Sequence, residues 1–166
     1  VNEVRTLSTG AATRIGYIDT GVDFSHPALS PWLDPGIDVL FGQAASEEEA
    51  SSPLTQQMAS VLDDRFTFIL NQAMASLLDG DNPSGTLPSA LGHGTLVAGI
   101  IHLFAPESRI VPIKAFDAYG NTTMFTIVDA IYRPKELDVD VLNMSFSFST
   151  TSDILHKAIV DVSASG

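Results

Sequence analysis

The chain of 166 residues carries 20 acidic and 8 basic side chains, which gives a formal net charge of −12, and it has no cysteine. The charge argues against nucleic acid and anionic membranes as partners, and the missing cysteines exclude disulfides, thiol catalysis and cysteine-ligated metals. A hydrophobic content of 45% is enough for a buried core, and the length fits one domain or part of one. No apolar run in the sequence is long enough to span a membrane.

The first predicted strand lies within residues 14–23 and ends in an aspartate. Its apolar residues stop at the tight turn Asp19-Thr20-Gly21, after a polar segment of small residues over 1–13. A carboxylate at the C-terminal end of a strand is common in the sites of α/β proteins. Asp19 is therefore a candidate functional residue, and the alternative is a turn aspartate that caps Gly21.

Residues 42–90 form a long connection, in which we predict a helical insert at about 44–80. Ser52-Pro53 favours a helix start. Apolar residues then recur at spacings of three and four as far as Leu77, which predicts one or two amphipathic helices outside the sheet. Asp79 to Gly85 resembles a calcium loop, but Pro83 occupies a ligand position and the terminal glutamate is missing, so we expect a solvated turn.

A histidine between two glycines opens the next predicted helix, in the stretch LGHGTLVAGII over residues 91–101. Apolar residues at helical spacing give this helix one buried stripe. His93 then lies at the N-terminus of the helix, where its imidazole can face a cleft. Gly94 and Gly99 are poor helix formers, so we expect close approach of another backbone at both. The alternative is a helix start that happens to carry a histidine.

Strands and helices alternate through the rest of the chain. We predict strands over 109–116 and 137–148 and helices over 123–132 and 151–162, with a turn at 120–122. This alternation indicates parallel βαβ units with right-handed crossovers. The predicted fold is therefore a three-layer αβα domain with a mostly parallel sheet.

Three blocks resemble the subtilisin-like serine peptidases, the subtilases of peptidase family S8: Asp19-Thr20-Gly21, the histidine stretch, and the run DVLNMSFS over 140–147. The chain order of the family's triad is Asp, His, Ser. The resemblance implies that His93 is the general base and acid, with Asp19 as its orienter. It also implies that residues 1–166 form the N-terminal portion of a serine endopeptidase domain, an incomplete subtilisin-like fold with fewer strands.

The nucleophile of the family has no counterpart in this sequence. The family's serine lies in a Gly-Thr-Ser block and its oxyanion asparagine in a later segment, whereas these 166 residues contain no Gly-Thr-Ser. Asn143 belongs to the substrate-strand block and does not match the oxyanion position. We therefore expect this chain alone to be inactive. The alternative function is a non-catalytic subtilase-like domain that binds peptides or a partner chain; a nucleotide-binding domain is disfavoured because no Gly-x-Gly-x-x-Gly or P-loop is present.

The resemblance also implies two backbone edges that clamp an extended peptide. One edge consists of Gly120, Asn121 and Thr122, and the other of Ser145, Phe146 and Ser147. The resemblance also implies that Phe116, Met124 and Phe146 line apolar pockets for substrate side chains. Ser147 and Thr122 stand where the family often has glycine, which narrows the space beside a bound backbone. The alternative is plain strand and turn packing.

The remaining expectations concern ligands, partners and location. In the family a loop aspartate binds calcium, but Ala28 stands at that position, so we expect no cofactor there. The partner implied is a polypeptide substrate, with no nucleic acid or membrane. Self-association or a partner chain is expected at an uncovered sheet edge, and the family resemblance implies a secreted or extracytoplasmic protein.

Overall fold

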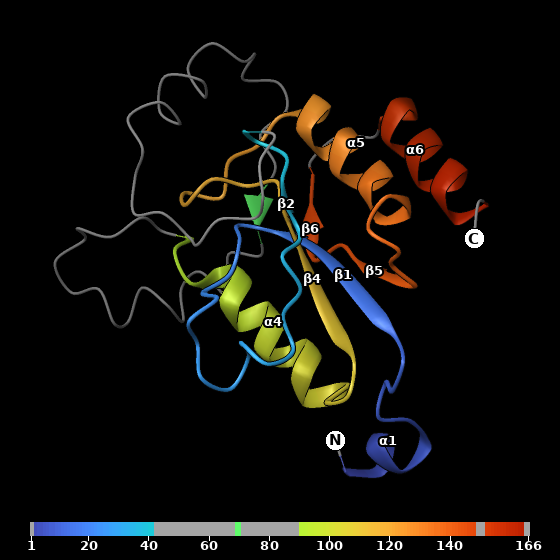
Figure 1. The fold of residues 1–166 in the computed structure, drawn as a ribbon. Helices are drawn as coiled ribbons and strands as arrows, with labels where there is room; N and C mark the ends of the chain where they lie inside the picture. Colours follow the sequence, from blue (N-terminus) through green and yellow to red (C-terminus); the bar gives the residue numbers. More distant parts are fainter. Residues whose placement is uncertain (1, 42–68, 71–89, 149–151, 165–166) are drawn as a thin grey trace, which may run out of the picture.

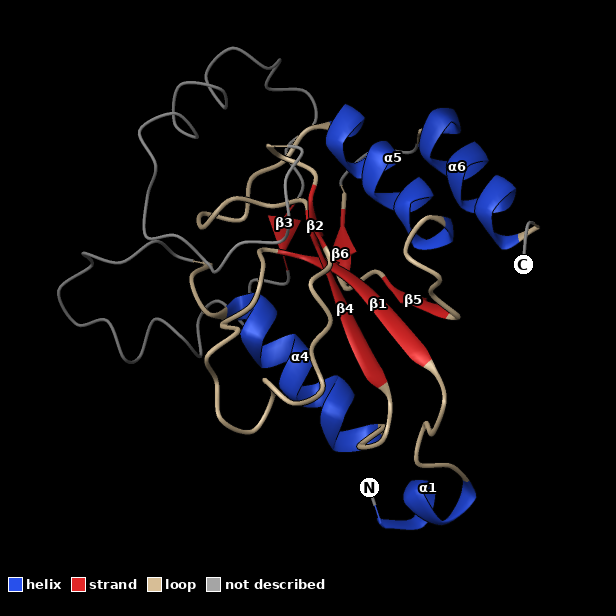
Figure 2. Cartoon of the chain, viewed as in Figure 1, coloured by secondary structure: helices blue, strands red, loops and turns tan. Residues whose placement is uncertain are grey.

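The computed structural model describes residues 2–41, 69–70, 90–148 and 152–164. Its main sheet has four parallel strands in the order β2-β4-β1-β5 (Figure 2), and a separate antiparallel pair joins β3 to β6. The strands of the main sheet are β1 (Arg14–Asp19), β2 (Ile37–Asp38), β4 (Arg109–Lys114) and β5 (Val141–Asn143). The antiparallel pair consists of β3 (Ile69–Leu70) and β6 (Phe146–Ser147).

Helices cover both faces of the sheet (Figure 1). The helical elements are α1 (Asn2–Leu7), α4 (His93–Phe104), α5 (Met124–Tyr132), a 3-10 turn η2 (Arg133–Lys135) and α6 (Asp153–Ser163). Within the described ranges, no helix is both long and apolar enough to cross a membrane.

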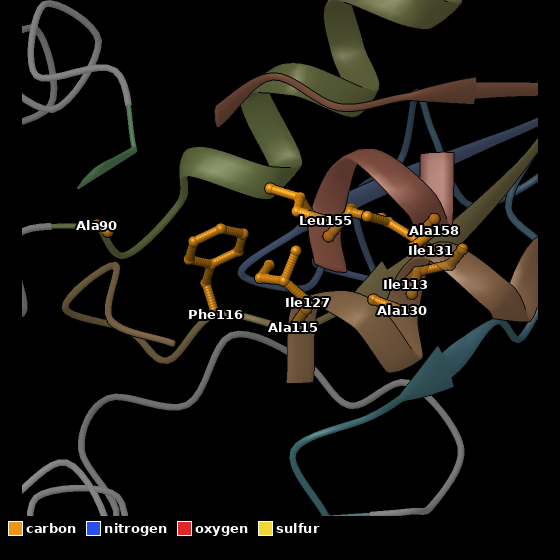
Figure 3. Close-up of a cluster of buried hydrophobic side chains, with 10 residues drawn as sticks. Ala90, Ile113, Ala115, Phe116, Ile127, Ala130, Ile131, Leu155 and Ala158 are labelled. Carbon is orange, nitrogen blue, oxygen red and sulfur yellow. The ribbon is translucent and has the colours of Figure 1, made fainter. Parts of the chain in front are cut away.

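Two hydrophobic cores lie on opposite faces of the sheet. Tyr17 and Ile18 are consecutive in β1 and therefore point to opposite sides. Tyr17 packs with Val97 of α4, whereas Ile18 belongs to the cluster that contains Ile127 of α5 and Leu155 of α6 (Figure 3). The predicted three-layer αβα arrangement is confirmed.

Ion pairs to one aspartate join the amino ends of the two central strands. Asp34 contacts the guanidinium groups of both Arg14, in β1, and Arg109, in β4, at 2.6 Å. Arg14 and Arg109 are also register partners, and the pairing continues residue by residue to Asp19 and Lys114. The register at one end of the sheet therefore determines which residues meet at the other end.

The two helices on the far face begin at capping residues close to their predicted starts. Thr123 Oγ1 accepts a hydrogen bond from the backbone N–H of Thr126 at 3.1 Å, and Ser152 Oγ accepts one from Leu155 at 3.3 Å. Each cap satisfies a backbone donor that a helix start leaves without an intrahelical partner. α5 ends at Tyr132, as the sequence predicts, and the chain continues into η2, which contains Pro134.

The structure differs from the sequence-based expectations in three segments. The polar N-terminal segment contains α1, which the sequence did not predict. The single strand predicted over 137–148 is two short strands, β5 and β6, after a turn. Within the predicted helical insert, Ile69–Leu70 form a strand because their backbone pairs with β6. The rest of that insert and the calcium-like loop over 79–85 lie outside the described residues.

The two glycines of α4 have different environments. A Cβ added at Gly94 would lie 2.0 Å from the carbonyl oxygen of Gly21, so this position requires glycine for close approach of the β1–α4 backbones. A Cβ added at Gly99 would meet none of the described atoms within 4 Å. The expectation of close approach is therefore correct for Gly94 and wrong for Gly99.

These environments predict opposite effects of the same substitution. Gly94→Ala should lower the free energy of unfolding by about 2–3 kcal/mol, because the helix must move away from Gly21. Gly99→Ala should raise it by about 0.5–1 kcal/mol, because alanine reduces the backbone entropy of the unfolded chain and does not clash. Urea unfolding of both variants measures the difference, and a stabilised Gly94→Ala variant would contradict the close approach.

The contact between α5 and α6 predicts that the free energy of unfolding depends on pH in the acid range. Asp161 accepts hydrogen bonds from Lys157 Nζ at 2.8 Å and Tyr132 Oη at 3.0 Å, and these bonds hold the pKa of Asp161 below its usual value of 3.8. This contribution to stability is present above the unfolded-state pKa and is lost as the pH falls through the lower folded-state pKa. In Asp161→Asn the free energy of unfolding should therefore fall less steeply as the pH is lowered into the acid range. Urea unfolding at a series of pH values measures this, and an unchanged pH dependence would show that the Asp161 contacts do not cause it.

Candidate active site

The candidate site lies where β1 ends and α4 begins. Asp19 is the last residue of β1 and His93 the first residue of α4, and both side chains are almost fully buried. The Nδ1 atom of His93 lies 2.7 Å from Oδ1 of Asp19. The predicted approach of these two side chains, which are separated by 74 positions in sequence, is confirmed.

This geometry determines what the imidazole can do chemically. A carboxylate acceptor at Nδ1 favours the tautomer whose proton is on Nδ1, and it stabilises the imidazolium once a second proton arrives. The other ring nitrogen, Nε2, is then a base in the neutral ring and an acid in the charged ring. The arrangement therefore suits proton transfer at Nε2 with Asp19 as a fixed counter-charge.

Thr20 joins the carboxylate to the helix that carries the histidine. Its backbone N–H donates to Asp19 Oδ1 at 2.8 Å, and its hydroxyl lies 3.3 Å from the same oxygen. The hydroxyl oxygen also accepts the backbone N–H of Gly94 at 3.1 Å. One buried side chain thus connects both halves of the pair, a role that sequence reasoning missed although Thr20 stands in the Asp-Thr-Gly block.

A second contact joins the turn after β1 to α4. The backbone N–H of Asp23 donates to Thr95 Oγ1 at 2.9 Å. Asp23 Oδ1 accepts bonds from the Ser25 hydroxyl at 2.6 Å and the Ser25 backbone at 2.8 Å, and these bonds lower the pKa of Asp23. Asp23 is therefore a structural residue of this turn.

The first predicted substrate edge, Gly120 to Thr122, belongs to a closed loop after β4. The carboxylate of Asp117 accepts the backbone N–H of Asn121 at 2.8 Å, and the Asp117 N–H donates to the carbonyl of Asn121 at 3.0 Å. Gly120 has φ +78°, a left-handed conformation that suits glycine. Asp117 therefore uses both backbone groups of Asn121, and the backbone N–H of Gly120 also donates to the carbonyl of Asp117 at 3.0 Å.

The second predicted edge, Ser145 to Ser147, contains β6. One side of β6 pairs with β3, with Leu70 opposite Phe146 and Ile69 opposite Ser147. Ser145 and Ser147 are exposed, and the Ser145 hydroxyl bonds with the side chain of Asn143 at 2.8 Å. This edge is therefore already paired on one side by the chain itself.

The aromatic residues near these edges belong mainly to the core. Phe116 is fully buried and lies 5.5 Å from Phe146, centroid to centroid. Phe146 and Met124 are partly buried against the same cluster. The prediction that Phe116 lines a substrate pocket is therefore wrong in this structure, because its ring fills the interior between the sheet and α5.

The described residues offer no cation site. Within the ranges that the structure describes, no three histidine, aspartate or glutamate residues gather around a common point. Ala28 is exposed, and its side chain has no oxygen to donate to calcium. The residues present at this loop therefore do not fit the calcium ion of the family resemblance.

Lys114 is a second residue of the site that sequence reasoning missed. It ends β4, is buried, and its Nζ donates to the backbone carbonyl of Thr20 at 2.5 Å. The available signal was a single lysine within the apolar run IVPIKAF over residues 110–116. Such a lysine is costly to bury without an acceptor.

Comparisons with known proteins show what this chain is similar to. The model of the family described as "Subtilase family" matches residues 10–165. "Thermophilic serine proteinase" of Bacillus sp. strain AK1 is 26% identical over 145 residues, which cover 87% of this chain and 28% of that protein. "Minor extracellular protease Epr" of Bacillus subtilis is 35% identical over 77 residues, 41% of this chain and 12% of that protein. The chain thus spans less than a third of the length of either relative.

A solved structure shows the same fold. The crystal structure of a cold adapted subtilisin-like serine proteinase aligns with a TM-score of 0.62 at 20% sequence identity, over 96% of this chain and 45% of that one.

The contacts of Thr20 lead to a matched pair of substitutions. Thr20→Val should lower the free energy of unfolding by about 1–3 kcal/mol, because it keeps the shape but leaves the Gly94 N–H without its acceptor. Thr20→Ser keeps the hydroxyl and should retain most of the stability. Urea unfolding of the two variants checks the expectation, and equal stability of Thr20→Val and the parent chain would show that the hydroxyl does not connect the two elements.

Proposed function

The chain belongs to the subtilase family, and from this membership we propose that it carries the Asp–His part of a serine endopeptidase. In this proposal the enzyme hydrolyses peptide bonds through an Asp-His-Ser triad. The observation that carries the proposal is the buried contact of 2.7 Å between His93 Nδ1 and Asp19 Oδ1.

The proposed roles follow from this contact. His93 takes the proton of the attacking serine through Nε2 and then delivers it to the leaving amine. Asp19 keeps the other ring proton on Nδ1 and stabilises the imidazolium that forms between the two steps. The chemistry uses protein side chains only, so the proposal includes no cofactor.

The serine and the oxyanion donor of this proposal are not among the 166 residues. The sequence has no Gly-Thr-Ser block. Asn143 does not supply the oxyanion donor in the proposal, because it lies in β5 and its amide bonds with Ser145 at 2.8 Å. This chain alone is therefore proposed to have no peptidase activity.

The proposed substrate is an extended polypeptide that lies between Thr122 and residues 145–147. The exposure of Ser145 and Ser147 supports this place. The peptide is proposed to pair with the backbone of residues 145–147. The side chains of Thr122 and Ser147 narrow this space relative to glycine.

A non-catalytic peptide-binding or partner-binding domain is the second candidate. The absence of Gly-Thr-Ser favours it, as does the use of both Asn121 backbone groups by Asp117. A partner strand, from a second copy or another chain, would meet the outer edge of β5, where Val141 is exposed. We also propose an extracytoplasmic location, supported by the relative that is called an extracellular protease.

A fluorophosphonate probe, which labels activated serines, tests the proposed inactivity of this chain. The 166-residue chain should remain unlabelled, since in subtilisin the loss of the nucleophile alone costs about 10⁶ in turnover. Labelling of this chain that disappears in His93→Ala would overturn the proposed inactivity, because it would mean that one of its own serines serves as nucleophile.

A longer form of the protein that contains a Gly-Thr-Ser block should be labelled. By analogy with subtilisin, His93→Ala should then reduce turnover by about 10⁶ and Asp19→Ala by about 10⁴. His156→Ala is the matched control, because this histidine is exposed on α6, and it should leave turnover unchanged. A long form that binds peptides without being labelled would favour the non-catalytic candidate.

A further inference from the structure

A buried lysine stands between two buried carboxylates at the carboxyl end of the sheet. Lys114 in β4 is the register partner of Asp19 in β1 and of Asp38 in β2. All three residues are less than 5% exposed. Register partners in neighbouring strands point to the same face of a sheet, so the three side chains form a row across it.

This row lies on the face that α4 covers. Tyr17 precedes Asp19 by two positions and packs against α4 residues, so Asp19 points to the same side. Asp38 is held by its own turn, where Oδ1 accepts the backbone N–H of Leu40 at 2.9 Å. Among the three aligned residues, Lys114 supplies the only positive charge, and buried carboxylates are costly without one.

The segment that follows Asp19 is held at three points. Lys114 Nζ donates to the carbonyl of Thr20 at 2.5 Å. Gly94 donates to the Thr20 hydroxyl, and the Tyr17 hydroxyl donates to the carbonyl of Gly21 at 3.3 Å. Gly21 has φ +114°, so this peptide has an orientation that few residues adopt without support. The contact from Lys114 is the only one of the three that involves a charged donor, and such bonds are stronger than neutral ones.

We propose that Lys114 is a positioning residue for the Asp19–His93 pair. Its ammonium holds the Thr20 carbonyl and thereby orients the turn in which the Thr20 N–H meets Asp19 and the Thr20 hydroxyl meets Gly94. The inference rests on the proposed function, because it concerns the same pair. Lys114 acts through Thr20 and is not assigned a contact with substrate.

The first experiment compares Lys114→Met with the parent chain by NMR of ring-labelled histidine. The chain has four histidines, and His93→Gln assigns the signal of interest. In the parent chain the Nδ1 proton of His93 should be protected from exchange by its bond to Asp19. In Lys114→Met this proton should exchange at least about tenfold faster, the loss expected when a buried hydrogen bond is misaligned. A purely structural lysine would lower global stability but leave this exchange rate unchanged in the folded chain, and that outcome overturns the proposal.

The second experiment covers the case in which Lys114→Met does not fold. Because the sequence has no cysteine, Lys114→Cys has a single thiol, which can be alkylated in the unfolded chain before refolding. An aminoethyl group rebuilds a side chain of lysine length with its ammonium, whereas a propyl group gives a side chain of the same length without the charge. Recovery of the protected His93 proton with the aminoethyl group alone supports the proposal. Equal results for the two adducts, whether both recover or neither does, overturn it.

A control separates this inference from the proposed function. Asp19→Ala, which removes the acceptor, should remove the protected His93 proton signal in a chain that keeps Lys114. If the signal survives Asp19→Ala, the proposed Asp–His pair is wrong. If it depends on Asp19 but not on Lys114, the pair stands and only the positioning role fails.

Discussion

The hydrogen bond between Asp19 and His93 is the contact on which the arrangement of this chain depends. It requires a strand end and a helix start from distant parts of the sequence to meet to within a few tenths of an ångström in a buried site. The parallel pairing of β1 with β4 makes this possible, because α4 leads directly into β4 and therefore crosses the face onto which Asp19 points. The catalytic proposal and the positioning role of Lys114 both follow from this one contact.

Thr20 connects three polar groups of this site. Thr20 uses its backbone N–H, hydroxyl and carbonyl for Asp19, Gly94 and Lys114 in turn. A buried network of this kind is stable only when its members are satisfied together, so its effects on stability should not be additive. The close approach at Gly94 is needed for the same network, because any side chain at this position would separate α4 from the turn after β1.

The two proposed peptide-binding edges are less complete than the contact between Asp19 and His93. Asp117 closes the loop of one predicted edge, and β3 pairs with one side of the other. Both contacts satisfy backbone groups that would otherwise be free for a peptide, and they do so within the chain itself. The described residues therefore hold Asp19 and His93 in contact, whereas part of the backbone of the two proposed edges is already used within the chain.

The sequence by itself determined the layer order, β1, α4, α5, α6 and the residues Asp19 and His93. These follow from local periodicity and from motifs whose chemistry is carried by short stretches. Only the tertiary structure decided the strand at Ile69–Leu70, the burial of Phe116, the open surroundings of Gly99 and the partner of Lys114. For three of these the deciding group lies elsewhere in the chain: β6 for Ile69–Leu70, Phe146 for Phe116, and Thr20 for Lys114. A local pattern indicates that a residue is apolar, small or charged, but register and packing determine which distant atom it meets.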